Sequence, residues 1–340
     1  MKIRAWEHAI RRSAGDPTAP PTPFIAADVD QQGDLRVHPP LAERRRRPAD
    51  EPAWAGFTRV DALAIVSVVA LLGGVLLPAL ARDQSHDTRS YCVFRLSQIA
   101  KAMALYAADS QEWLPPNPDD GNTTPYRNWF GGISAIGGGQ EFNTDLPSDR
   151  TRALLAPYLT DPSTVYRCPA DRRLGVYQGA DVRKKGQRVP PVRTISLNGG
   201  VGTNPYRGQG KVAVDGPWLD GNHAHVANRT WYCYGSMSDF VRPGPSRTFT
   251  FLEEDPRSIN DGTFAMVGPS TPQLFRLLDW PATYHDMACA VAFADGHAEM
   301  HRWLDSRTKL TTSGFVSSQP DNPDVVWLAQ RASALIKGGN

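Results

Sequence analysis

The sequence predicts an α+β fold in which one long N-terminal helix, with a transmembrane half, packs on an antiparallel β-sheet head with long loops. Two observations predict this fold. An uncharged apolar run covers residues 62–80 and passes directly into an amphipathic helical pattern that ends near residue 112. Beyond it, Gly, Pro, Asn and Asp interrupt the chain roughly every ten residues, which is typical of short antiparallel strands. We therefore expect three parts, at residues 1–56, 57–112 and 113–340.

The charge balance argues against a protein that neutralises nucleic-acid phosphates. The 340 residues include 37 Lys and Arg and 35 Asp and Glu, so the net charge is +2 with neutral His. The 29 Gly and 29 Pro residues predict many loops. We expect no nucleic-acid partner.

The first part of the chain, residues 1–56, contains proline-rich stretches at 17–23 and 38–40 and shows no apolar period. Such a composition predicts a disordered leader. The stretch 41–56 would by itself make a short basic leader, so a later start site is a second interpretation.

The apolar run at residues 62–80 is the candidate membrane span. It is close to the ~20 residues that a helix needs to cross ~30 Å of hydrocarbon. A buried core helix is the alternative, but such a helix usually has a polar stripe, and here Ser67 is the one polar side chain. Four arginines at 44–47 precede the run, so the positive-inside rule places the N-terminus in the cytoplasm and the head outside.

The helix continues beyond the run. Apolar residues recur every three or four positions from Cys92 through Leu96, Ile99 and Met103, which predicts a half-buried face. The one proline inside the pattern is Pro78, where we expect a kink.

The clearest strands of the head are residues 288–294 and 297–303, joined by Asp295-Gly296. This dipeptide favours a type I′ hairpin turn. Helices are predicted at 149–158 and at 323–336, flanking the sheet.

The residues before the apolar run, Gly56-Phe57-Thr58-Arg59-Val60-Asp61, form a short motif. It resembles the signature of type IV prepilins and type II secretion pseudopilins. The resemblance implies a pilin-like fold, cleavage after Gly56 by a prepilin peptidase and N-methylation of Phe57. It also implies a bacterial inner-membrane location with a periplasmic head, and assembly with other pseudopilin subunits into a structural filament for protein secretion.

Asp61 has a physical role in this interpretation. A carboxylate at the start of an apolar helix is costly to bury alone. The α-amino group of Phe57, freed on a neighbouring chain, would be a suitable partner when the helices stagger correctly. Asp61 would then fix the register of neighbouring helices. Its alternative role is an ordinary polar flank.

Several patterns in the head resemble large pseudopilin-like proteins of planctomycetes. They are Tyr91-Cys92, the segments 166–171 and 193–198, and a C-terminal mark in which His285 is followed nine residues later by Asp295-Gly296. This resemblance implies an architecture and assigns no cargo.

Cys92, Cys168, Cys233 and Cys289 all lie on the expected outer side, where disulfides persist. We favour a Cys92–Cys168 pair, which would join the helix to the head. A zinc site built from the four cysteines lacks any Cys-x-x-Cys spacing. Buried free thiols are the remaining interpretation.

Two further sets of residues could bind a metal. Glu253, Glu254 and Asp255, with Asp261 nearby, form an acidic stretch that could hold Ca²⁺ through oxygen ligands. His285 and Asp295 could join the alternating side chains of His297, Glu299 and His301, although a solvated hairpin face explains that alternation as well. No cofactor is required by the predicted function, and Ca²⁺ is the candidate ion.

The sequence contains none of the common hydrolase or phosphate-binding motifs, so we do not expect an enzyme. Two alternative functions stay open. One is a membrane-anchored metal-dependent hydrolase that uses His285 and Asp295. The other is a glycan-binding surface protein that uses exposed tryptophans such as Trp129, Trp218 and Trp231.

Overall fold

The computed structural model describes residues 27–29, 35–37, 58–118, 127–205, 211–268, 276–311 and 317–336, without the side chains at 27–29, 35–37, 73, 75–87 and 317. The chain divides into two units, Met1–Val69 and Ala70–Asn340. Within the predicted leader, β1 (Ala27–Val29) pairs antiparallel with β2 (Leu35–Val37). The rest of that leader, with Gly56 and Phe57, lies outside the described residues.

The long helix α1 (Arg59–Asp109) confirms the prediction of one helix over this region. Its start is a capping box. The Thr58 hydroxyl accepts a hydrogen bond from the Asp61 N–H at 3.2 Å, and the Asp61 carboxylate accepts from the Thr58 N–H at 3.0 Å. The backbone of α1 continues through Pro78, whose side chain lies outside the described residues.

The predicted transmembrane half of the helix is corrected by the structure. Within the described part of the chain, no helix combines the length and the apolarity that crossing a membrane requires. The predictions of a pilin-like fold with a membrane span and of a single-pass inner-membrane location are therefore wrong.

The second unit is built on a five-stranded sheet in the order β10-β9-β6-β5-β7. Its strands are β5 (Ile195–Asn198), β6 (Phe249–Glu253), β7 (Thr263–Phe264), β9 (Ala288–Phe293) and β10 (Ala298–Arg302). All neighbours pair antiparallel except β5 and β7, which pair parallel. The sheet is therefore mixed at one edge, which the turn pattern in the sequence did not predict.

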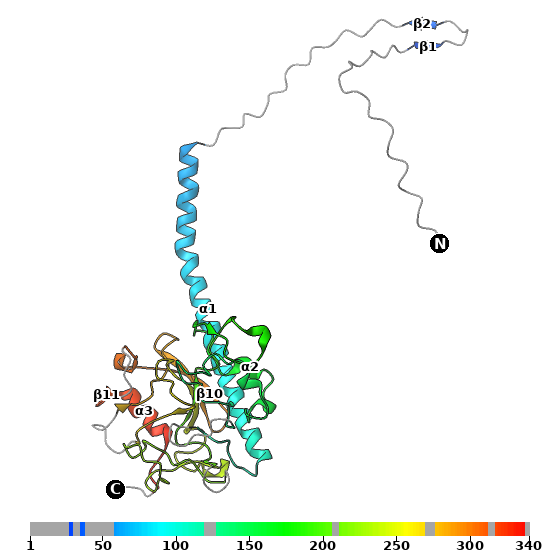
Figure 1. Cartoon of the computed structure of the whole chain (residues 1–340). Coiled ribbons are helices and arrows are strands. Elements are labelled where there is room, and N and C mark those ends of the chain that lie inside the picture. Colours follow the sequence, from blue (N-terminus) through cyan, green and yellow to red (C-terminus); the bar gives the residue numbers. More distant parts are fainter. Residues whose placement is uncertain are drawn as a thin grey trace, which may run out of the picture. The chain divides into compact units, whose positions relative to one another are not determined.

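Two hydrophobic cores lie on the two faces of the sheet, one against α1 and the other against α3 (Pro323–Ala332). Figure 1 shows these helices on either side of the strands. Strand β9 explains the arrangement, because its side chains alternate. Ala290 and Ala292 face α1, whereas Cys289, Val291 and Phe293 face α3. The small alanines let α1 approach the sheet closely.

The predicted hairpin is confirmed as β9 and β10, in the register Ala292 with Ala298. Its turn differs from the predicted type I′. Gly296 has a φ of 90°, but Asp295 does not have a positive φ. The Gly296 N–H donates to the Phe293 carbonyl at 3.0 Å, and the Phe293 N–H donates to the His297 carbonyl at 2.9 Å. These bonds define a tight turn followed by a glycine bulge.

The helix predicted at 323–336 is confirmed as α3 over Pro323–Ala332, with Asn322 as its N-cap, and it ends earlier than predicted because Ser333 is extended. The helix predicted at 149–158 is wrong. Asp149 accepts from the Thr151 N–H at 3.0 Å, which favours a turn, and only the short 3₁₀ helix η2 (Ala156–Tyr158) follows.

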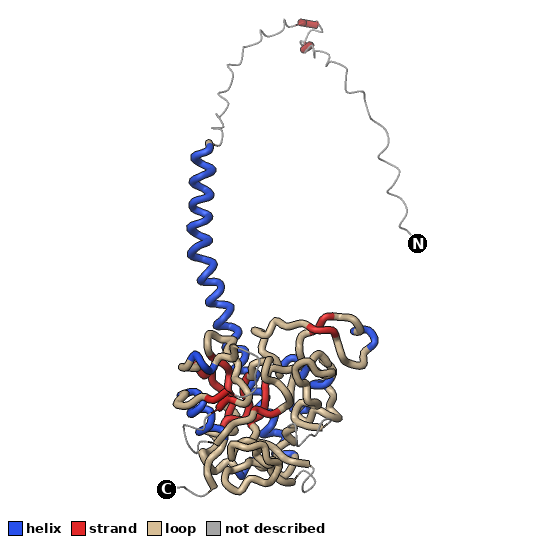
Figure 2. The backbone as a smooth tube through the Cα atoms, turned by 60° about the vertical axis from the view of Figure 1, so that its left-hand side comes forward, coloured by secondary structure: helices blue, strands red, loops and turns tan. Residues whose placement is uncertain are grey.

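Loops make up most of the rest of the head, as Figure 2 shows. The short elements among them are η1 (Leu146–Ser148), α2 (Pro162–Val165), β3 (Gly175–Val176), η3 (Val182–Lys184), β4 (Arg188–Val189), η5 (Met237–Asp239), β8 (Arg276–Leu277), η7 (Ser306–Thr308) and β11 (Ser317–Ser318).

Candidate functional site

Four buried side chains from distant parts of the chain meet beside α1, and we call them the cysteine–histidine cluster: Cys92, Cys168, Glu253 and His285. The Cys92 thiol donates to the Cys168 Sγ at 3.3 Å. The Cys168 Sγ lies 3.4 Å from the His285 Nε2, which lies 3.5 Å from the Glu253 Oε2. One potential ligand atom from each residue lies within 4.8 Å of the other three. All four side chains can ligate a metal ion.

The fold brings these residues together from four elements. Cys92 lies on the buried face of α1, and Glu253 is the last residue of β6, in the middle of the sheet. Cys168 follows α2, and its N–H donates to the Thr194 hydroxyl at 2.8 Å. His285 lies just before β9. The cluster therefore joins α1 to the sheet.

A tight turn fixes the position of His285. Asp286 and Met287 have φ values of 59° and 55°, a left-handed conformation that is rare for residues other than glycine. The His285 N–H donates to the Ala288 carbonyl at 3.3 Å, and Arg89 of α1 donates to the His285 carbonyl at 2.6 Å. Backbone strain of this kind is concentrated at functional sites.

Electrostatics within the cluster distinguish the two thiols. The hydrogen bond from Cys92 lowers the pKa of Cys168, and donating that bond raises the pKa of Cys92. Burial alone would lower the pKa of His285, but its contacts with Cys168 and Glu253 raise it to about 9. Burial alone would likewise raise the pKa of Glu253, yet the His285 imidazolium lowers it. Cys168 is thus the more acidic thiol of the pair.

The Glu253 carboxylate is the least satisfied member. Its side chain is 0% exposed. The Oε2 atom accepts from the Ala290 N–H at 2.9 Å. The Oε1 atom is buried and has no hydrogen-bond partner among the described residues. A buried carboxylate oxygen without a partner is costly, so this atom calls for an explanation.

The other acidic residues predicted as calcium ligands do not join Glu253. Glu254 accepts from the Ser258 hydroxyl at 2.9 Å and also from Ser196. Asp255 pairs with Arg257 at 2.7 Å, and Asp261 accepts from the Thr263 N–H at 2.7 Å. Neighbouring side chains diverge here because a strand ends at Glu253 and a loop begins.

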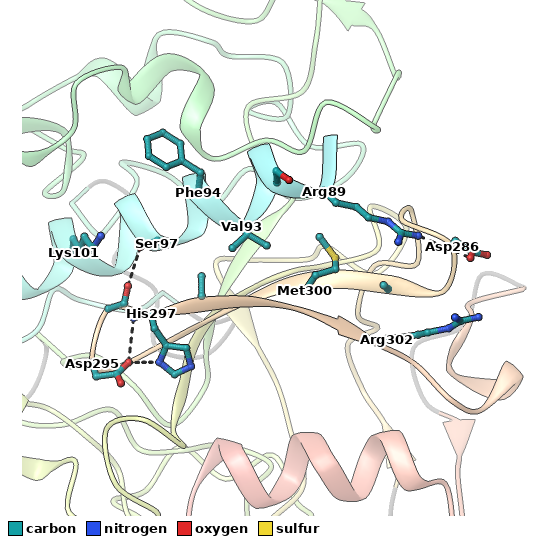
Figure 3. A pocket seen from close by; sticks show the side chains of 14 residues that line it. Arg89, Val93, Phe94, Ser97, Lys101, Asp286, Asp295, His297, Met300 and Arg302 are labelled. Atoms are coloured by element: carbon teal, nitrogen blue, oxygen red, sulfur yellow. Dashed lines mark hydrogen bonds and ion pairs between the residues drawn. The ribbon is translucent and has the colours of Figure 1, made fainter. Parts of the chain in front are cut away.

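Asp295 and Gly296 lie at the far end of β9 from His285, beside a groove of 1020 Å³ between α1 and the hairpin. Figure 3 shows Val93 and Met300 within this groove. The Ser97 hydroxyl of α1 donates to the Gly296 carbonyl at 2.9 Å. The nine residues between His285 and Asp295 span the length of β9, and the chain contacts α1 at both ends of this strand. Asp295 therefore lies outside the cluster.

The alternating residues of β10 also lie apart from the cluster. His297 pairs with Asp295 at 2.5 Å and stacks on Phe293. His301 stacks on Trp327 of α3, with ring centroids 3.7 Å apart, and burial lowers its pKa to about 4. Glu299 is exposed. The described positions of these side chains fit the face of a hairpin.

Of the four predicted disulfide candidates, Cys92 and Cys168 come together as free thiols. Cys289 is buried on the α3 side of β9, and Cys233 is half-buried beside Gly216. Burial raises the pKa of Cys233 to about 12.

The tryptophans proposed for glycan binding are not exposed as predicted. Trp129 and Trp231 lie in the protein interior, at 0% and 2% exposure, and Trp218 is half-buried. Trp129 contacts Phe130, Tyr166 and Phe251 at ring-centroid distances of 4.6–5.4 Å. These aromatic rings pack in the hydrophobic core.

A second candidate site is the start of α1, residues 59–72, which we call the apolar segment. Its large hydrophobic side chains are 50–73% exposed: Val60, Leu63, Ile65, Val66, Val68, Val69, Leu71 and Leu72. Asp61 is exposed, and hydrogen bonds from Thr58 lower its pKa. Exposed apolar surface on this scale marks a contact site.

No protein-family model, curated protein or solved structure matches this chain. Each member of the cluster is a candidate in the sequence, but the sequence does not predict that the four meet. It pairs the two cysteines with each other and groups Glu253 with its acidic neighbours, and no spacing links these sets to each other.

Proposed function

We propose that this protein is a structural, pseudopilin-like subunit that assembles into a filament by packing its apolar segment against copies of the same segment. Processing by a prepilin peptidase after Gly56 would precede assembly. The observation that supports the proposal is the continuous exposure of apolar side chains over residues 60–72. Burying one of these side chains against a partner would stabilise the assembly by about 1.5–3 kcal/mol.

The distribution of these side chains around the helix favours several neighbours over one. At about 100° per residue, the eight exposed apolar residues lie on all sides, with no gap wider than about 60°. A helix that docks on a single partner has an apolar stripe and a polar face. A helix that is apolar on all sides is suited to the centre of a bundle.

Charges at the start of the segment support a staggered arrangement of identical helices. Arg59 and Asp61 carry opposite charges two residues apart, and both are exposed. In a staggered bundle Asp61 can face Arg59, or the freed α-amino group of Phe57, on the next copy. Burial among apolar helices strengthens such a pair and penalises an unpaired carboxylate.

Electron microscopy and sedimentation of the processed chain test this proposal. We expect the parent to form regular filaments and L63E/V66E to sediment as a monomer, because two buried carboxylates without partners oppose packing. Leu304→Glu is the matched control, since Leu304 is 77% exposed but lies outside α1. This control should assemble like the parent.

Asp61→Ala tests the register. We expect shorter or irregular filaments from a chain whose head unfolds like that of the parent. Regular filaments from L63E/V66E, or a parent that stays monomeric at every concentration, would contradict the proposal.

A further inference from the structure

The cysteine–histidine cluster has three successive ligand separations close to those of a tetrahedral metal centre. Zinc binds Cys sulfur at ~2.3 Å and His nitrogen or carboxylate oxygen at ~2.0–2.2 Å, so neighbouring ligand atoms in a tetrahedron lie about 3.3–3.8 Å apart. The three successive separations from Cys92 through Cys168 and His285 to Glu253 are 3.3, 3.4 and 3.5 Å. All four ligand atoms lie within 4.8 Å of one another, so shifts of up to about 1 Å, including a widening of the sulfur–sulfur distance to about 3.8 Å, would complete the tetrahedron around an ion.

From this geometry we propose that Cys92, Cys168, Glu253 and His285 bind one Zn²⁺ ion. Two sulfur ligands and one imidazole favour zinc over Ca²⁺ or Mg²⁺, which take oxygen ligands. Binding releases to solvent the protons carried by the two thiols and by the Nε2 atom of His285, so that both sulfurs ligate as thiolates and His285 ligates as a neutral imidazole.

The unsatisfied oxygen of Glu253 supports this assignment independently of the distances. The side chain is fully buried, and its Oε1 atom has no hydrogen-bond partner among the described residues. A bound cation would compensate the charge of this carboxylate and of the thiolates in an interior that otherwise disfavours them. Oε2, the oxygen that lies 3.5 Å from His285, also accepts from the Ala290 N–H at 2.9 Å, and this bond orients the carboxylate within the cluster.

The site is closed, which indicates a structural role. The four residues are 0–4% exposed, so no coordination position opens to solvent for a substrate. Structural zinc sites have four protein ligands, whereas catalytic sites keep one position open. Because the ligands come from α1, the segment after α2, β6 and the turn before β9, the ion would hold α1 on the sheet.

The test is metal binding by the full chain, purified under reducing conditions and stripped by a chelator. After equilibration with Zn²⁺ alone and removal of free ion, elemental analysis should find about one zinc per chain. With Co²⁺ alone, the chain should show the absorption of tetrahedral cobalt and thiolate-to-cobalt charge transfer. A disulfide between Cys92 and Cys168 would consume both sulfurs, so its formation under reducing conditions without bound metal would overturn the proposal.

Variants assign the site to these residues. Cys168→Ser should weaken zinc binding by at least about 100-fold, the upper end of the loss seen when a supporting residue of a metal site is removed. Cys233→Ser removes a thiol elsewhere and should bind zinc like the parent. Glu253→Gln keeps the side-chain shape and should retain the charge-transfer bands with weaker affinity.

The cobalt spectrum of the parent decides the question even if Cys168→Ser fails to fold. A parent without thiolate charge transfer, or a folded Cys168→Ser chain that binds zinc as tightly as the parent, would overturn the assignment.

Discussion

The two ends of α1 differ in what their apolar residues do. In the apolar segment, residues 59–72, the large hydrophobic side chains point in all directions and are exposed. In the later part, the buried hydrophobic residues lie within about 160° of the helix circumference: Cys92, Leu96, Ile99, Ala100, Ala102, Met103 and Ala107. That stripe packs against the alanines of β9.

One continuous helix can thus present two kinds of surface. The later part has one apolar stripe because one sheet covers it. The apolar segment has no stripe, and within the described residues nothing covers it. Packing within the head and the proposed packing between chains would therefore be encoded at different positions of the same element, and substitutions should separate them.

The largest expected difference is between two leucines of α1. Leu96→Ala should lower the free energy of unfolding of the head by about 2–5 kcal/mol, because Leu96 is fully buried between α1 and the sheet. Leu63→Ala should change it by less than about 0.5 kcal/mol, since Leu63 is 67% exposed. Urea denaturation followed by tryptophan fluorescence measures both. Equal losses of unfolding free energy for the two variants would show that the two ends of α1 do not differ in packing.

A polar anchor of the later part gives a smaller effect. Arg95 is buried, and its guanidinium donates to the carbonyls of Thr164 at 2.6 Å and Arg167 at 2.8 Å. Arg95→Met should lower the free energy of unfolding by about 2–3 kcal/mol, because it leaves these carbonyls without their donor. Lys101→Met removes an exposed cation from the same helix and should be close to neutral. Similar losses for the two variants would show that Arg95 is not an anchor.

The smallest effect is a pH dependence that belongs to the head alone. Burial lowers the pKa of His301 from 6.5 to about 4, so the unfolded chain binds more protons between these values. The free energy of unfolding should therefore fall as the pH drops from about 6.5 towards 4, by about 1 kcal/mol from this half-buried residue.

His301→Gln should flatten that pH dependence, and L63E/V66E should leave it unchanged. Denaturation curves at several pH values measure the slope. A slope that changes with the apolar segment would mean that the two ends of α1 are coupled.

Much of the local structure could be predicted. The helix across residues 59–109, the hairpin of β9 and β10 and the C-terminal helix follow from periodicity and turn residues. The predicted membrane span is wrong, and a turn around Asp149 stands where a helix was predicted at 149–158. At 149–158 the side chain of Asp149, which caps a turn, outweighed the helical pattern of the short window.

The candidate metal site shows the same limit. The sequence identified Cys92 and Cys168 as a pair and gave Glu253 and His285 as candidates, but in different sets. Their convergence depends on the order of strands in the sheet, since β6 lies between β5 and β9. Side chains 32 residues apart in the sequence, Glu253 and His285, become neighbours only through that order.

The range of α1 and its apolar residues could be predicted from the amino-acid sequence, because helix formation and side-chain periodicity depend on residues a few positions apart. Only the tertiary structure decided that Glu253 separates from Glu254 and Asp255 and meets a histidine and two thiols. The physical reason is that a strand alternates its side chains between two faces, so the partner of each residue is set by what packs on that face.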